Sequence, residues 1–213
     1  MVPTSCHLPV SLLAAIGQVE SGSLVGHPVD AQHRTSVLGP VLDGNGFAAI
    51  RDTDHGRWDG DPTWDRAVGP MQFIPSTWER FGVDGDGDGE ANPQDLEDAT
   101  AATAAYLCYG GRDLSQAPDL RSAVLSYNHS QAYLELVLTY QARYAALGLD
   151  DEGVVRGLPT SIALNATPVG TMDGWSSSRT VTHTKHHGSG TKHTSGSPTP
   201  VGLPGGSPSS GGP

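Results

Sequence analysis

The segment from Leu8 to Gly22 constrains the fold most, because it predicts an α-helix that places a carboxylate among aliphatic side chains. When the segment is wound at about 100° per residue, five aliphatic residues share one arc: Leu8, Leu12, Leu13, Ile16 and Val19. Glu20 falls inside this arc, between Ile16 and Leu13. The rest of the protein must therefore cover a helix face that includes Glu20.

Two interpretations of Glu20 follow from this position. A carboxyl group held against aliphatic side chains loses hydration of its charged form, so its pKa rises and it can hold a proton near neutral pH. Such a group is suited to general acid catalysis. Alternatively, Glu20 marks a frayed helix end and faces water. The helix alone leaves both interpretations open.

Composition excludes some classes of function. The 213 residues carry a formal net charge of −11, whereas phosphate binding needs a basic surface, so we expect no nucleic-acid partner. No run of 18 or more apolar residues occurs, and we expect no transmembrane segment. The first residues lack the basic-then-apolar pattern of a signal peptide, so we expect any export signal to lie outside this sequence.

The sequence divides into a domain over residues 1–150 and a tail over residues 151–213. From Gly188 to Pro213, 22 of 26 residues are Gly, Ser, Thr or Pro, which predicts a low-complexity, disordered tail. Residues 23–70 are rich in Gly, Asp and Pro and predict a long ordered loop region with a short strand over Gly46–Ile50.

Four more helices are predicted within the domain. Pro75–Phe81 forms a short helix closed by Gly82, and Asn92 with Pro93 opens a helix that runs to Tyr109. The last two cover residues 120–127 and 130–147. We therefore expect a mainly α fold with a long Asp/Gly-rich loop region.

The strongest local motif is Asp84 to Asp95, which has the spacing of an EF-hand calcium loop. Oxygen-bearing side chains stand at loop positions 1, 3, 5, 9 and 12, and the position-7 ligand is a backbone carbonyl. The predicted ligands are Asp84, Asp86, Asp88, the Glu90 carbonyl, Asn92 and Asp95. The spacing predicts a structural Ca²⁺ ion, whereas the alternative is an acidic turn without an ion.

Two further motifs place polar residues at breaks in the helical pattern. Val68 to Trp78 reads Val-Gly-Pro-Met-Gln-Phe-Ile-Pro-Ser-Thr-Trp, an apolar segment around Gln72. Gln72 either binds a ligand amide or hydroxyl or satisfies backbone groups. Ser126 to Ser130 reads Ser-Tyr-Asn-His-Ser and serves either a ligand or plain helix capping.

The two cysteines, Cys6 and Cys108, either form a disulfide or remain as two buried thiols. A disulfide is favoured if the protein is exported. On the chain-entropy model, closing a loop of roughly 100 residues stabilises the fold by up to about 4–5 kcal/mol.

Taken together, these motifs resemble the lytic murein transglycosylases of the B type, which have a lysozyme-like fold. The resemblance covers about residues 5–147 and keeps the motif order. The matching stretches are Val19-Glu20-Ser21, Gly69 to Trp78, the loop from Asp84 through Ala99, Tyr106-Leu107-Cys108 and Ser126 to Ser130.

The resemblance implies that Glu20 is the single catalytic acid/base. It would cleave the β-1,4 bond between N-acetylmuramic acid and N-acetylglucosamine and leave a 1,6-anhydromuramoyl end. No second carboxylate is then needed, unlike in ordinary glycosidases. The implied saccharide-binding residues are Gln72, Ser76, Tyr127 and Asn128, with Tyr106 and Trp78 as weaker candidates.

The resemblance also implies a setting outside the cytoplasm and peptidoglycan strands as the partner, and we expect a monomer. It assigns no role to the aspartates of the Asp-rich loop: Asp52, Asp54, Asp59, Asp61 and Asp65. One of these could supply a second carboxylate and make the enzyme a hydrolytic muramidase, although such residues more often form Asx turns. A second alternative is a calcium-stabilised wall-binding module without turnover.

Overall fold

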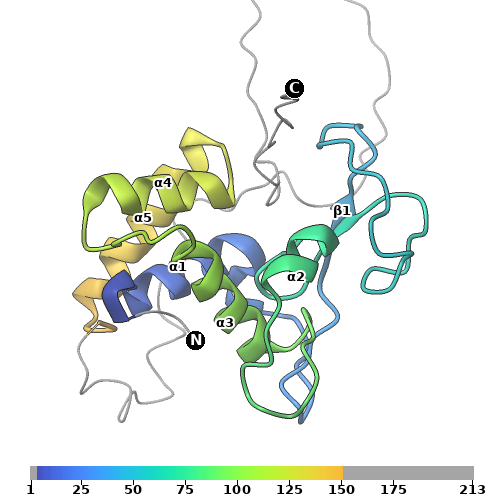
Figure 1. Ribbon diagram of the computed structural model, residues 1–213, viewed down its shortest axis with the longest axis horizontal. Helices are drawn as coiled ribbons and strands as arrows, with labels where there is room; N and C mark the ends of the chain where they lie inside the picture. Colours follow the sequence, from blue (N-terminus) through green and yellow to red (C-terminus); the bar gives the residue numbers. More distant parts are fainter. Residues whose placement is uncertain (1–3, 151–213) are drawn as a thin grey trace, which may run out of the picture.

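The computed structural model describes residues 4–150, where five α-helices and one two-stranded sheet form (Figure 1). The elements are η1 (Thr4–Cys6), α1 (Val10–Ser21), η2 (Gly22–Leu24), β1 (Leu38–Val41), β2 (Arg66–Val68), α2 (Pro75–Phe81), α3 (Leu96–Leu107), α4 (Ala117–Tyr127) and α5 (Gln131–Ala146). The predicted mainly helical class is confirmed. The predicted tail, residues 151–213, lies outside the described residues.

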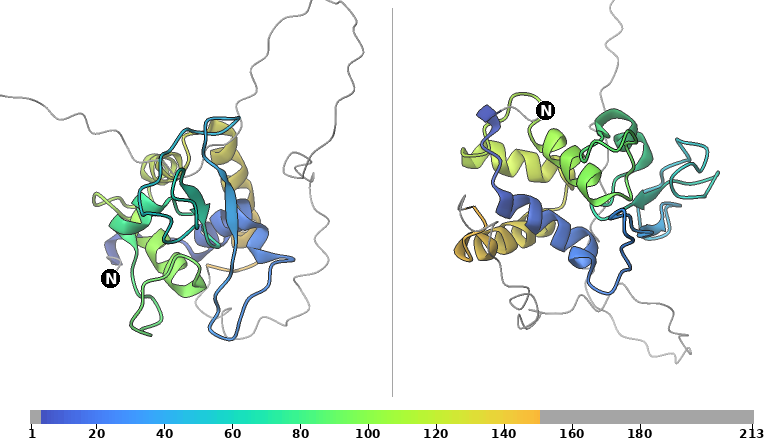
Figure 2. Two further views of the ribbon diagram at one scale, coloured as in Figure 1. Left: turned by 90° about the vertical axis from the view of Figure 1, so that its right-hand side faces the viewer. Right: turned by 90° about the horizontal axis from the view of Figure 1, so that it is seen from below.

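Helices α1, α4 and α5 lie together on one side of the domain, and the sheet and the long loops lie on the other (Figures 1 and 2). The chain passes from the last turn of α1 through η2 into the loops, so Glu20 stands where the two sides meet. None of the helices in the described residues is long and apolar enough to cross a membrane.

Helix α1 packs mainly against α5, as its apolar arc predicts. Leu12 and Ile16 are fully buried, and they face a core to which α5 contributes Leu134 and Val137. At the other end of the helix, Gly22 takes the left-handed conformation with φ +63° and donates its N–H back to the last carbonyls, which is the usual helix C-cap.

A disulfide joins Cys6 in η1 to Cys108 at the end of α3, so the pairing favoured from the sequence is confirmed. The backbone reinforces this link, because the N–H of Leu114 donates to the carbonyl of Cys6. The start of the chain is thereby tied to the centre of the domain.

The sheet differs from the prediction. Strands β1 and β2 pair antiparallel, with Leu38 opposite Val68, and within Gly46–Ile50 the structure shows only an isolated bridge between Asp43 and Ala49. The predicted strand is wrong because a turn occupies the start of this segment. The carboxylate of Asp43 accepts hydrogen bonds from the backbone and the side chain of Asn45, which closes an Asx turn.

Two helix starts also differ. Helix α3 begins at Leu96, and its N-cap is Asp95, whose carboxylate accepts from the N–H groups of Glu97 and Asp98. Asn92 instead closes a turn in the preceding loop, where its Oδ1 accepts from the N–H of Gln94. Asn and Asp are both good N-cap residues, and α3 uses Asp95, the later of the two. Helix α4 begins at Ala117 rather than at residue 120.

Candidate active site

Glu20 lies in the last turn of α1 and faces α5. The hydroxyl of Tyr133 donates a hydrogen bond of 2.5 Å to Glu20 Oε1. Tyr133 itself is 4% exposed, so this contact links residues 113 positions apart inside the domain. The Glu20 side chain is half-buried and held against α5, which argues against a frayed helix end that points freely into water.

Burial dominates the electrostatics of Glu20. It raises the pKa of the carboxyl group from 4.5 to about 7, while the hydrogen bond from Tyr133 acts in the opposite direction. Burial also raises the pKa of Tyr133 well above 10, and the charge of Glu20 adds to this rise. At neutral pH the site thus contains a carboxyl group that exchanges its proton readily and a tyrosine that keeps its own.

Tyr127 connects the end of α4 to the segment that follows β2. It is fully buried, and its hydroxyl donates 2.7 Å to the carbonyl of Met71. The charge of Glu20, together with burial, raises the pKa of Tyr127 well above 10. Tyr127 therefore stands within electrostatic reach of Glu20 and holds the backbone next to Gln72.

Gln72 stands in a strained turn. The backbone of Val68 and Phe73 exchanges two hydrogen bonds, and the intervening turn leaves Gln72 with φ +53°, which is unusual for a residue with a side chain. Its Nε2 donates 2.9 Å to the carbonyl of Gly69. Strain of about 1–3 kcal/mol at such a position is typical of functional sites, and it fixes the direction of this amide.

Glycine is required at position 69, where the turn that holds Gln72 packs against the predicted metal loop. Its φ is +80°, and a Cβ at this position would lie 1.7 Å from the carbonyl oxygen of Pro93. Only glycine permits this approach. The turn around Gln72 is thereby packed directly on the segment that leads into α3.

The other predicted saccharide-binding residues have defined places. Asn128 is 3% exposed, and its Oδ1 accepts from the N–H of Ser130 at 3.0 Å. Tyr106 is 5% exposed, and its hydroxyl donates to the carbonyl of Ser126. Ser76 lies half-buried in the first turn of α2. The hydrogen bond of Tyr106 gives it a structural role between α3 and α4.

Trp78 belongs to the core. It is 4% exposed and packs edge-on against Phe73, with 5.3 Å between ring centroids. Phe73 in turn packs edge-on against Tyr127. This row of rings joins α2 to α4 and accounts for the burial of Trp78.

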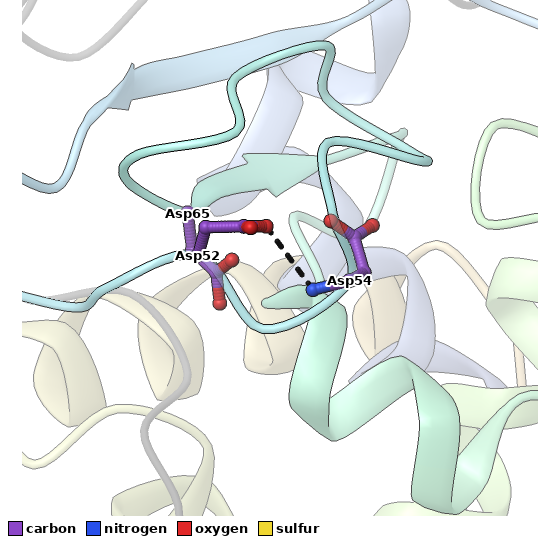
Figure 3. Close-up of side chains that lie close together, drawn as sticks. All are labelled: Asp52, Asp54 and Asp65. Atoms are coloured by element: carbon purple, nitrogen blue, oxygen red, sulfur yellow. Dashed lines mark hydrogen bonds between the residues drawn. The ribbon is translucent and has the colours of Figure 1, made fainter.

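The carboxylates of the Asp-rich loop mainly bind the loop's own backbone. Figure 3 shows Asp52, Asp54 and Asp65, whose carboxylate oxygens lie within 4.8 Å of one another. Asp65 accepts from the N–H and the hydroxyl of Thr53, and Asp52 accepts from the N–H groups of Asp54 and Gly56. The same holds for Asp59 and Asp61, which accept from the N–H groups of Arg66 and Thr63. The Asx-turn interpretation is supported.

The segment from Asp84 to Asp95 brings three carboxylates together. Oxygens of Asp84, Asp86 and Asp88 lie within 4.8 Å of one another, and all three side chains are exposed. Arg34 lies beside them, with its Nη2 2.8 Å from Asp88 and 3.1 Å from the Glu90 carboxylate. These hard oxygen donors suit a divalent cation such as Ca²⁺.

Asp98 turns back into this loop, and the sequence reasoning missed it. It is 1% exposed, and its two oxygens accept from the N–H groups of Gly85 (2.6 Å) and Asn92 (2.8 Å). Asp95, the predicted position-12 ligand, instead caps α3. Asp98 is thus the carboxylate that joins the two ends of the loop.

Residues 47–117 match the family described as the transglycosylase SLT domain. The matched segment is 71 of the 213 residues. The match supports a lytic transglycosylase of the lysozyme-like superfamily, an enzyme class that acts on peptidoglycan and hence on the cell wall. Comparison with curated proteins and with solved structures gave no match.

The matched segment contains the Gln72 turn and the Asp84–Asp98 loop, and it ends before Tyr127. Glu20 precedes it. The case for Glu20 therefore depends on the geometry that surrounds it. Tyr133, which the sequence reasoning also missed, has a weak signal in the sequence, because it stands in an aromatic stripe of α5 that is typical of core packing.

Proposed function

We propose that this SLT-domain protein is a B-type lytic transglycosylase that cleaves the β-1,4 bond between N-acetylmuramic acid and N-acetylglucosamine. The observation that carries the proposal is the half-buried position of Glu20 against Tyr133, where loss of hydration raises the pKa of Glu20 to about 7. A group with this pKa can donate a proton in one step and accept one in the next at neutral pH.

The reaction needs one acid/base group. The Glu20 carboxyl proton passes to the glycosidic oxygen as the bond from that oxygen to the anomeric carbon breaks. The 6-hydroxyl oxygen of the muramoyl residue then bonds to the anomeric carbon, and its proton passes to the Glu20 carboxylate. The product is a 1,6-anhydromuramoyl end, no water is consumed, and Glu20 is protonated again.

The surroundings of Glu20 support this single-carboxylate scheme. In residues 4–150, Glu20 has its side-chain hydrogen bond with Tyr133 and none with a second carboxylate. The aspartates of the Asp-rich loop accept backbone hydrogen bonds within that loop. A hydrolytic glycosidase uses a second carboxylate at a fixed distance, and the engagement of these aspartates by their own loop supports a scheme without one.

We assign substrate binding to Gln72, Ser76, Tyr127 and Asn128. Gln72 is held in a fixed direction by its turn, and Tyr127 supports that turn through the Met71 carbonyl. Such fixed amides orient N-acetyl groups. Tyr106 is retained as a weaker member of this set. We further propose that the enzyme acts outside the cytoplasm as a monomer.

The decisive experiment is mass spectrometry of muropeptides released from purified sacculi, with Glu20→Gln tested in parallel. Products one water lighter than hydrolytic ones, absent with Glu20→Gln, are expected. Glu135→Gln is the matched control, because it makes the same change at an exposed position of α5. Full-mass products with reducing ends would show a muramidase. Binding without release by either protein would show a wall-binding module.

We also propose a structural Ca²⁺ ion at the loop that begins at Asp84. Asp84, Asp86 and Asp88 would bind it with the Glu90 carbonyl, and Asp98 would close the site in place of Asp95. The side-chain Oδ1 of Asn92 accepts from the N–H of Gln94. Asn92 therefore supports the backbone of the loop, and we do not assign it as a ligand. A bound cation would offset the repulsion between three adjacent carboxylates.

Thermal unfolding with Ca²⁺ and with EGTA tests this site. Chelation should lower the melting temperature of the wild type, and Asp98→Asn should abolish the difference between the two conditions. Asp95→Ala should lower both melting temperatures, because loss of the helix cap costs about 1 kcal/mol of stability, and should keep the difference between the two conditions. A wild type that melts identically in Ca²⁺ and EGTA would refute the metal site.

A further inference from the structure

An apolar groove runs along α1 on a face that the described chain leaves uncovered. Its volume is about 380 Å³, and its main lining residues are Val10, Leu13, Ala14, Leu24, Met71 and Leu96. Val10 is 48% exposed and Leu96 37%. The positions 10, 13, 14, 17 and 21 of α1 all line the groove, so it follows the whole length of this helix.

The lining does not suit a saccharide. Sugar hydroxyls and N-acetyl groups need hydrogen-bond partners, whereas two of the lining hydroxyls are already engaged. Ser21 donates to the carbonyl of Gly17, and Ser23 donates to the side chain of Gln18. Met71 forms part of the floor, because a Cβ at Gly17 would lie 3.4 Å from its sulfur. Apolar side chains are the chemistry that this surface fits.

Asp150, the last described residue, lies against the first turn of α1. The carboxylate of Asp150 accepts from the N–H of Ser11 (2.8 Å) and from its hydroxyl (2.7 Å). Ser11 is the neighbour of Val10, which lines that end. Asp150 therefore lies at the end of α1 where the groove begins.

The sequence that follows contains an apolar segment of suitable length. Of residues 154–164, five of eleven are Val, Leu or Ile, whereas residues 165–213 contain four in 49. Val154 follows Asp150 by four residues and reaches up to about 14 Å from it. The α1 face from Val10 to Ser21 is about 16 Å long, which about five extended residues span.

We propose that residues 154–164 dock in this groove and run parallel to α1, with Val154 and Val155 at the Val10 end and Leu158 toward Met71. The docked segment covers the exposed Val10 and Leu96 side chains. The groove borders the candidate active site, because Leu13 and Ser21 line it beside Glu20 and Met71 precedes Gln72. The test of the docking therefore reads methyl contacts and not activity.

Nuclear Overhauser effects between methyl groups of the full-length protein test the docking. Contacts between the methyls of Val154 or Val155 and those of Val10 or Leu13 are expected. They should vanish in the triple variant Val154→Ser, Val155→Ser, Leu158→Ser. The matched control, Val201→Ser with Leu203→Ser, should keep them.

Two results would overturn the proposal. The first is a wild-type spectrum without these contacts and with groove methyl shifts equal to those of the triple variant. The second is contacts that appear only between differently labelled copies in a mixed sample, which would make a second copy the occupant. Since all substitutions lie outside the described domain, loss of folding does not complicate either reading.

Discussion

Glu20→Gln should stabilise the protein at alkaline pH and have little effect at acidic pH. In the folded state the pKa of Glu20 is about 7, against 4.5 for an unperturbed glutamate. The folded state therefore holds the proton more strongly, and stability falls as the pH rises from 4.5 to 7. At 1.36 kcal/mol per pKa unit, the loss is about 3 kcal/mol. Glutamine does not titrate and avoids this loss.

Urea unfolding of wild type and Glu20→Gln at pH 4 and pH 8.5, with the disulfide intact, measures the effect. The difference in unfolding free energy between the two proteins should grow by about 3 kcal/mol from the lower to the higher pH. Glu135→Gln, at an exposed site, serves as the control and should show no comparable growth. A Glu20→Gln difference that is the same at both pH values would refute the raised pKa of Glu20.

Three other predictions concern the surroundings of the site. Tyr133→Phe removes a hydrogen bond to a charged group, worth about 1.5–3 kcal/mol, so it should raise the pKa of Glu20 by about one to two pH units. The alkaline limb of the pH–activity profile should move to higher pH by the same amount, and a limb that stays in place would contradict this. Replacing both Cys6 and Cys108 by Ser opens a loop with a sequence separation of 102. The unfolding free energy measured with denaturant should fall by about 4–5 kcal/mol, and a fall below about 1 kcal/mol would contradict the chain-entropy reasoning. Gly69→Ala should destabilise the fold by on the order of 3 kcal/mol or more, because backbone strain adds to a clash with Pro93. In the control Gly22→Ala the new Cβ meets nothing within 4 Å, so this variant should lose only the strain energy. Equal losses of stability in the two variants would contradict the clash.

The sequence was sufficient to predict features that depend on local pattern. The helix Pro75–Phe81 is predicted to the residue, because Pro at its start and Gly after its end are strong signals. The apolar arc of α1 predicted both the buried face and the unusual place of Glu20. In each case the deciding residues lie within a few turns of one another.

Features that depend on contacts between distant segments could not be predicted from the sequence. The contact from Tyr133 to Glu20 joins the two ends of the domain, and an aromatic residue in a helix stripe gives no sign of such a role. At the metal loop, Asn92, Asp95 and Asp98 are all plausible ligands or caps by residue type. Only the position of the α3 start decides that Asp95 caps the helix and Asp98 faces the loop.

Two features of this domain are unfavourable for its stability, and the disulfide is large enough to offset most of their cost. Burial of Glu20 costs about 3 kcal/mol at alkaline pH, and the strained turn at Gln72 costs a further 1–3 kcal/mol, roughly. The Cys6–Cys108 link, at about 4–5 kcal/mol, is of the same order as their sum and ties the segment before α1 to the end of α3. A domain with ordinary net stability of about 5–15 kcal/mol would lose much of it to these two features alone. The cross-link is therefore of the right size to offset the cost of holding a protonated glutamate and a strained turn in one domain.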